Sequence, residues 1–136
     1  MDETPKSFAD QEAVEEFMTR PDPALSNDLA ALDGDILILG VGGKMGPTLA
    51  RLAKRAAPDK YVIGVARFSE AELQAKLNSW DIETIKADLL DRDVLAKLPK
   101  PKNIIFMAGR KFGSAGSEEL TWAMNVHCPA LVAEAF

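Results

Sequence analysis

The sequence has one cysteine, one histidine and one tyrosine among its 136 residues, and these scarcities narrow what the chain can be. The single cysteine, Cys128, cannot form a disulfide within the chain. The single histidine, His127, has no acid or cysteine nearby at metal-ligand spacing, so we expect no metal site. No apolar run approaches the roughly 18 residues of a membrane span, and the first residues, Met1 to Glu3, are acidic where a secretory signal would be basic. We therefore expect a cytoplasmic protein.

Positive charge is scarce near the N-terminus. Residues 1–33 hold nine acids and two bases, a net charge of −7, whereas residues 34–136 hold twelve acids and fourteen bases, a net charge of +2. Such a chain is a poor general binder of nucleic acid, which needs clustered Lys and Arg, but its basic remainder suits a small phosphorylated ligand. We expect an acidic helical leader over residues 1–33 and one domain over residues 34–136. We favour a leader that packs on the domain over one that serves as a partner-binding arm.

A buried strand that runs into a glycine turn and then a helix is predicted from residue 35 onward. The four apolar residues Ile36–Leu39 are typical of a strand covered on both faces. Gly40 allows a tight turn off this strand, Gly43 leaves the backbone bare where a phosphate could approach, and Gly46 lets the helix sit close to the sheet. Pro47 suits the first turn of that helix.

The amides at the start of this helix, together with its dipole, make an anion site. The spacing does not fit a nucleoside triphosphate loop, because Lys44 is followed by Met45 instead of Ser or Thr. The turn therefore favours a dinucleotide.

Three more strands are predicted to follow the turn, each separated from the next by a helix. Their ranges are Tyr61–Ala66, Ile82–Ala87 and Asn103–Met107. This alternation implies parallel pairing with right-handed crossovers, and hence a Rossmann-like, doubly wound α/β sheet in the strand order 3-2-1-4. A ligand would lie above the carboxyl ends of the first and fourth strands, where the winding reverses.

Capping residues and apolar periodicity predict the remaining helices. A short helix is expected over Gln11–Thr19, and the Arg20–Pro23 segment is expected to break it. The residues predicted to begin later helices are Ser26, the capping box from Ser69 to Glu72, Asp91, and Ser117 after a loop from Arg110 to Gly116. Pro129 is expected to kink the final helix.

Arg67 stands at the end of the second predicted strand, 21 residues after Gly46. In a fold of this kind, that position meets the ribose of the adenosine. An acid there would bind the 2′-hydroxyl of NAD, whereas an arginine can pair with a 2′-phosphate through two hydrogen bonds. We therefore expect NADP to be preferred, and the alternative is an exposed arginine with no ligand.

These residues resemble the extended short-chain dehydrogenase/reductases, the NAD(P)-dependent epimerase/dehydratase family, over residues 35–136. The turn from Gly40 to Gly46 is similar to the family's G-x-x-G-x-x-G turn, and Asp88-Leu89 resembles its adenine-binding pair. The segment that ends in Ala108-Gly109 resembles the strand beside the cofactor ribose, and Asn125-Val126 resembles the Asn-Val of the next helix. The cofactor-binding residues that follow from the spacing and the resemblance are Gly40, Gly42, Gly43, Lys44, Met45, Gly46, Arg67, Asp88, Leu89, Ala108, Gly109 and Asn125.

The chain departs from the family in its catalytic residues. Active members carry a Tyr-x-x-x-Lys pair, but the only tyrosine here, Tyr61, falls within the second predicted strand, and the chain ends at Phe136. The resemblance therefore implies a truncated NAD(P)-binding domain of an epimerase, dehydratase or reductase, inactive alone, whose parent acts on a sugar nucleotide or small carbonyl compound. The alternative is a non-catalytic NAD(P)-sensing or interaction protein. We expect the open edge of the fourth strand to pair with another copy, giving a homo-oligomer, or to be hidden by the leader.

Two roles are open for each of several polar residues near the predicted crevice. Lys44 contacts a phosphate or is only solvated. Arg110 and Lys111 meet a substrate anion or belong to a plain surface loop. Asn125 orders a water or a backbone carbonyl beside the crevice, or is a satisfied core amide.

Overall fold

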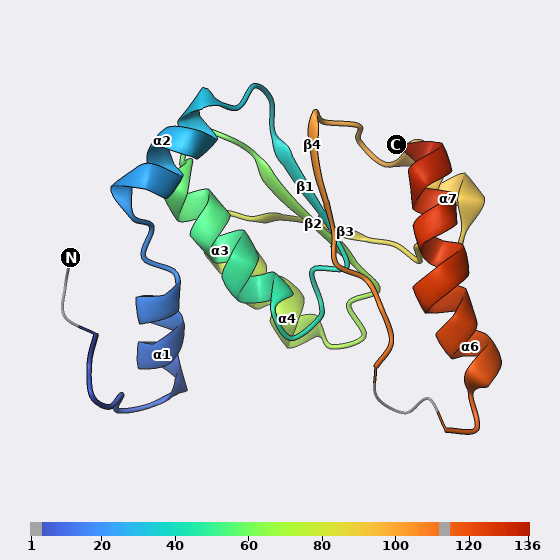
Figure 1. The fold of residues 1–136 in the computed structure, drawn as a ribbon, viewed down its shortest axis with the longest axis horizontal. Coiled ribbons are helices and arrows are strands. Elements are labelled where there is room, and N and C mark those ends of the chain that lie inside the picture. The colour runs from blue at the N-terminus through green and yellow to red at the C-terminus, as the bar shows by residue number, and fades with distance from the viewer. Residues whose placement is uncertain (1–3, 112–114) are drawn as a thin grey trace.

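The computed structural model describes residues 4–111 and 115–136, and the predicted loop from Arg110 to Gly116 lies partly outside them. The chain folds into a parallel four-stranded sheet with helices on both faces (Figure 1). The strands are β1 (Ile36–Leu39), β2 (Val62–Ala66), β3 (Glu83–Lys86) and β4 (Asn103–Phe106), in the order β3-β2-β1-β4. The predicted α/β class and strand order are confirmed.

Strand β1 is central because all four of its side chains are apolar and can be buried on either face. Ile36 pairs with Val62 of β2 on one side and with Asn103 of β4 on the other. Its residues are at most 2% exposed. Alternate side chains enter opposite layers: Ile36 and Ile38 pack on one face, and Leu37 and Leu39 on the other. The run of apolar residues therefore fixes β1 in the middle of the molecule.

One face of the sheet is covered by α3 (Gly46–Ala56) and α4 (Ala71–Ser79), each of which places small or branched apolar residues on it. The leader helices, α1 (Gln11–Met18) and α2 (Pro23–Ala31), contact the outer side of α3 (Figure 1). Neither helix runs along β4 (Figure 1), so the leader helices do not hide that edge, and its pairing with another copy stays a prediction.

The other face is covered by α5 (Arg92–Lys97) and α7 (Cys128–Ala135). Helix α7 continues from α6 (Glu118–Trp122) through η1 (Ala123–His127), one turn of π-helix. Cys128, Leu131 and Val132 bury this helix against β1 and β2. None of the described helices is long and apolar enough to cross a membrane.

Three local predictions are corrected by the structure. Helix α2 begins at Pro23 because the Asp22 carboxylate caps it, accepting a hydrogen bond from Leu25 N at 2.7 Å, so Ser26 is not its cap. Helix α4 has Glu70 at its N-cap and no side-chain capping bond, so the predicted capping box is absent. Tyr61 precedes β2 and is 60% exposed. The predicted kink at Pro129 stays a prediction: the last helix widens into a π-turn just before this proline, which sits within the first turn of α7.

Candidate cofactor site

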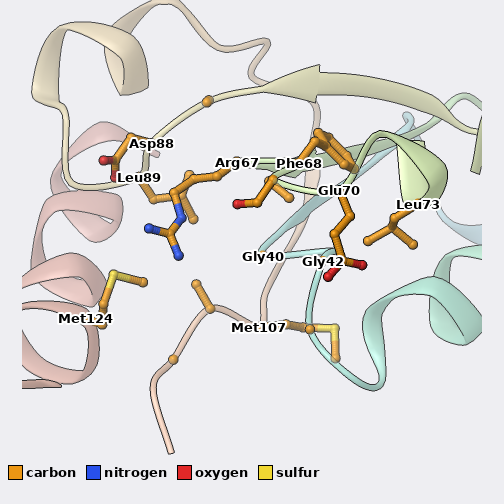
Figure 2. A pocket seen from close by; sticks show the side chains of 16 residues that line it. Gly40, Gly42, Arg67, Phe68, Glu70, Leu73, Asp88, Leu89, Met107 and Met124 are labelled. Atoms are coloured by element: carbon orange, nitrogen blue, oxygen red, sulfur yellow. The ribbon is translucent and has the colours of Figure 1, made fainter. Parts of the chain in front are cut away.

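A cavity of about 390 Å³ opens above the carboxyl ends of the four strands (Figure 2). This edge is where a doubly wound sheet binds its ligands. Each strand contributes the residues that follow it, so that segments far apart in the sequence meet at one place. The lining residues are Gly40, Gly42, Gly43, Ala66, Arg67, Phe68, Ser69, Glu70, Leu73, Ala87, Asp88, Leu89, Met107, Ala108, Gly109 and Met124.

Gly40 turns the chain off β1 in a conformation that a side chain would not tolerate. Its φ is +88°, and a Cβ atom placed on it would lie 2.5 Å from the backbone nitrogen of Ala108. The amides of Gly40 and Val41 both donate to the carbonyl of Val65, at 2.8 and 3.1 Å. The turn is thus anchored to β2 at its start and packed against the end of β4.

Gly46 lets α3 approach the turn closely. A Cβ atom there would lie 2.1 Å from the carbonyl oxygen of Val41, so no larger residue fits without moving the helix. Met45 is the N-cap and makes no side-chain capping bond, while Pro47 sits in the first turn and has no amide hydrogen to satisfy. The positive end of the α3 dipole therefore opens toward solvent beside the cavity.

The middle of the turn is open, in contrast to its two ends. A Cβ atom on Gly43 would meet only the Gly40 carbonyl oxygen, at 3.7 Å, and its φ lies outside the left-handed region. Neither packing nor backbone conformation within the chain requires glycine there. The amides of Gly42, Lys44 and Met45 donate no hydrogen bond to any other residue within the described ranges. The turn thus presents unpaired donors and a space that a side chain would fill, which fits the diphosphate of a dinucleotide.

Arg67, the first residue after β2, extends its guanidinium into the cavity on the side of Leu89 and Met124 (Figure 2). It forms no ion pair with any residue that the structure describes. Two acids share the lining. Glu70 points toward Gly42 (Figure 2), while the Asp88 carboxylate accepts a hydrogen bond from Leu90 N at 3.0 Å. A ligand phosphate would therefore find its cation at Arg67.

The comparison with known families agrees with this geometry. A model of the NAD dependent epimerase/dehydratase family matches residues 36–136, about three quarters of the chain. The chain belongs to this family. A search of curated proteins found no significant match. Members of an NAD-dependent family use a dinucleotide, and the open glycine turn of this epimerase/dehydratase domain fits that cofactor class.

Most of the predicted site residues of this epimerase/dehydratase domain line the cavity together. Lys44, Met45, Gly46 and Asn125 do not. Lys44 and Met45 are exposed, and Gly46 is buried beneath the turn. Eight of the predicted residues are in the lining: Gly40, Gly42, Gly43, Arg67, Asp88, Leu89, Ala108 and Gly109.

Asn125, in the π-turn, uses its side chain on the backbone of the segment that follows β4. Its Oδ1 accepts from Arg110 N at 2.6 Å, and its Nδ2 donates to Arg110 O at 2.7 Å. A Cβ atom on Gly109 would lie 3.4 Å from the same Oδ1. Asn125 therefore holds the strand end that carries Ala108 and Gly109 in the cavity wall.

Sequence reasoning missed several residues of the cavity wall. Phe68 is 7% exposed and has a φ of +46°, which bends the segment between β2 and α4. This bend brings Glu70 to the lining, and no local pattern in the sequence signals it. Leu73, Met107 and Met124 are apolar and supply the walls; their apolar periodicity indicated burial but not that they face a cavity.

Cys128 lies just behind the cavity wall. It is fully buried, its Sγ lies 3.7 Å from the carbonyl oxygen of Leu89, and burial raises the pKa of its thiol, with Asp88 adding to the effect. The thiol is therefore a core group and remains protonated at neutral pH. Among the described residues, no three His, Cys, Asp or Glu side chains are grouped in a way that could hold a metal ion.

Proposed function

We propose that this domain binds NADP in preference to NAD, with the diphosphate on the amides of the Gly40–Gly46 turn. The observation that carries the diphosphate position is the open space at Gly43 beside the start of α3, which a side chain would fill. The protein's own packing leaves that space unused. Backbone donors at a helix N-terminus favour a phosphate group by hydrogen bonding and by the dipole.

Arg67 would then meet the 2′-phosphate of the adenosine ribose, because its guanidinium extends into the cavity beyond the end of β2. Asp88 and Leu89 would border the adenine, and Ala108 and Gly109 the cofactor ribose near β4. A bound nicotinamide supplies hydride transfer, while the protein binds and orients it.

We further propose that the domain serves an epimerase/dehydratase or a reductase that acts on a sugar nucleotide or a small carbonyl compound. This chain would be inactive alone. Its only tyrosine, Tyr61, is followed four positions later by Val65 where the family's pair has Lys, and it lies before β2, away from the carboxyl ends of the strands. The same placement of Tyr61 favours the second candidate function, a non-catalytic protein that senses the cofactor.

The proposed cofactor preference is tested by titrating the protein with NADP and with NAD in a calorimeter. Replacing Arg67 with Ala should weaken NADP binding by about tenfold or more, because a charge-assisted hydrogen bond contributes about 1.5–3 kcal/mol. NAD binding should be almost unchanged. The matched control is Arg92→Ala, which removes an exposed arginine of α5 that lies outside the cavity.

Two results would overturn the proposal. If the folded wild-type protein binds neither cofactor at millimolar concentration, the cavity does not serve a dinucleotide. If Arg67→Ala weakens the binding of NADP and of NAD equally, Arg67 does not bind the 2′-phosphate. Turnover of a carbonyl substrate by this chain alone would contradict the proposal that it is inactive.

A further inference from the structure

The leader helix α1 connects the two helices whose first turns border the cavity. The family match covers residues 36–136, so this helix lies outside the part of the chain that the family shares. Helix α1 contacts α3, and its acids reach both α3 and α4.

Glu16 joins α1 to α3. Its carboxylate forms ion pairs with Arg51 at 2.8 Å and with Arg55 at 3.0 Å. Arg55 also donates to the hydroxyl of Thr19 at 3.0 Å, and Thr19 is fully buried. The side chain of Arg51 is 18% exposed and that of Glu16 is 38% exposed, so this ion pair is open enough for salt to screen it.

Glu15 joins α1 to α4. Its carboxylate pairs with Lys76 at 2.7 Å, and only 16% of the Glu15 side chain is exposed. Trp80, which ends α4, lies beneath the cations of both helices, with the Arg51 guanidinium 4.5 Å and the Lys76 ammonium 5.1 Å from its ring centre. Arg51 therefore contacts α1 and the end of α4 at once.

Both helices that α1 joins begin beside the cavity. Helix α3 begins at Gly46, directly after the open turn, and α4 follows Glu70, which lies in the cavity lining. Leu73 of α4 also lines the cavity, and a Cβ atom on Gly42 would lie 3.8 Å from it. A change in the separation of α3 and α4 would therefore change the gap between the turn and the segment after β2.

We propose that Glu15 and Glu16 are positioning residues that hold α3 and α4 at the separation that cofactor binding needs. The leader thus sets the affinity of a site that it does not touch. This inference rests on the proposed function, because it concerns the same cavity.

The charges around Glu15 and Glu16 show that the ion pairs joining α1 to α3 and α4 depend on both carboxyl groups being ionised. The hydrogen bond from Lys76 lowers the pKa of Glu15, with help from Gln11 and Arg51. The hydrogen bond from Arg55 lowers the pKa of Glu16, and the nearby charges of Arg55, Arg51 and Arg20 add to the effect. Both acids are therefore ionised at neutral pH, and the ties are complete there.

The test compares Glu15→Gln/Glu16→Gln with Glu12→Gln. Glu12 lies on the same helix and forms no ion pair with a described residue. Its substitution therefore also replaces a carboxylate of α1 by an amide, but it removes no ion pair between helices. The double variant should bind NADP about three- to fivefold more weakly at low salt, as expected for the loss of a few partly exposed ion pairs. Glu12→Gln should bind like the wild type. At 1 M salt the ratio between variant and wild type should fall toward one, because salt screens the wild-type ties as well.

Amide hydrogen exchange without cofactor tests the tie itself. In the double variant, the Leu49 amide, which bonds Met45 O in the first turn of α3, and the amides of α4 should exchange faster. The Ile36 amide, which bonds Tyr61 O in the sheet, should be unchanged. If the double variant is too unstable to measure, Glu16→Gln alone replaces it.

The outcomes separate this inference from the proposed function. Faster exchange confined to the amides of α3 and α4, together with weaker NADP binding, supports the positioning role. The positioning role is overturned if exchange in the double variant is accelerated equally at all amides, or if this variant binds NADP as tightly as the wild type at low salt. The leader would then only stabilise the fold. If no form binds NADP, the proposed function fails, and the inference fails with it even where exchange shows that the tie exists.

Discussion

Replacing Gly43 with Ala should abolish much of the cofactor affinity while leaving the fold intact. The added methyl group would meet only one protein atom, the Gly40 carbonyl oxygen at 3.7 Å, in a backbone conformation that Ala adopts freely. The stability change should therefore stay within about 0.5 kcal/mol, or be slightly favourable. The methyl group fills the space proposed for the diphosphate and displaces it from the turn amides. Losing one or two charge-assisted bonds, each about 1.5–3 kcal/mol, corresponds to roughly 10- to 100-fold or more in affinity.

Gly40→Ala is the informative contrast because it should damage the fold itself. The positive φ costs about 1–2 kcal/mol for Ala, and overlap with the Ala108 backbone at 2.5 Å adds about 1–3 kcal/mol. Against a total stability of about 5–15 kcal/mol, this should lower the unfolding temperature by roughly 10 °C.

Calorimetric titration and thermal unfolding, measured on both variants, separate the two effects. Because NAD and NADP share the diphosphate, Gly43→Ala should weaken both by the same factor. If a folded Gly43→Ala protein binds either cofactor within twofold of the wild type, the reasoning about the turn is refuted. Loss of the fold in Gly43→Ala would refute the packing argument.

Three further predictions follow from the site and the leader. Glu70→Gln should strengthen NADP binding by about two- to fivefold, because it removes a negative charge beside the turn; an unchanged or weaker calorimetric affinity would contradict this. Asn125→Ala should cost about 1–3 kcal/mol and lower the unfolding temperature, since the Arg110 backbone groups lose two partners; a wild-type melting curve would argue against the clamp. Because the pKa values of Glu15 and Glu16 lie below their ordinary 4.5 in the folded protein, the stability that they contribute is present above about pH 4.5 and is lost as pH falls through their folded values. Urea unfolding between pH 7 and pH 3 should therefore show a shallower loss of stability in the double glutamine variant, and equal slopes would contradict the assignment.

The sheet and the glycine turn could be predicted because their signals are local. Four consecutive apolar residues indicate a strand buried on both faces, and the glycine spacing identifies where backbone must approach backbone. The crossover rule then orders the strands without any knowledge of side-chain contacts. Arg67, Asp88 and Ala108 could be placed at one edge for the same reason, since each directly follows or closely succeeds a parallel strand.

Other features depend on contacts that no local pattern contains. The left-handed backbone of Phe68 brings Glu70 into the cavity, and its cause lies in how the segment packs. The pairing of Glu15 with Lys76 joins residues 61 positions apart. The start of α2 was predictable in principle, because a proline in the first turn after Asp22 is a regular helix start. The same proline is also a typical helix breaker, which is the interpretation given above for the Arg20–Pro23 segment.

The most direct test of the central claim is a ¹H–¹⁵N NMR titration of the folded protein with NADP. The amide signals of Gly42, Lys44 and Met45 should shift most, because these unpaired donors would take up the diphosphate, and the signal of Arg67 should shift with them. The proposed site is contradicted if saturating NADP leaves the amide signals of the turn unshifted, or if it shifts only signals remote from the carboxyl ends of the strands.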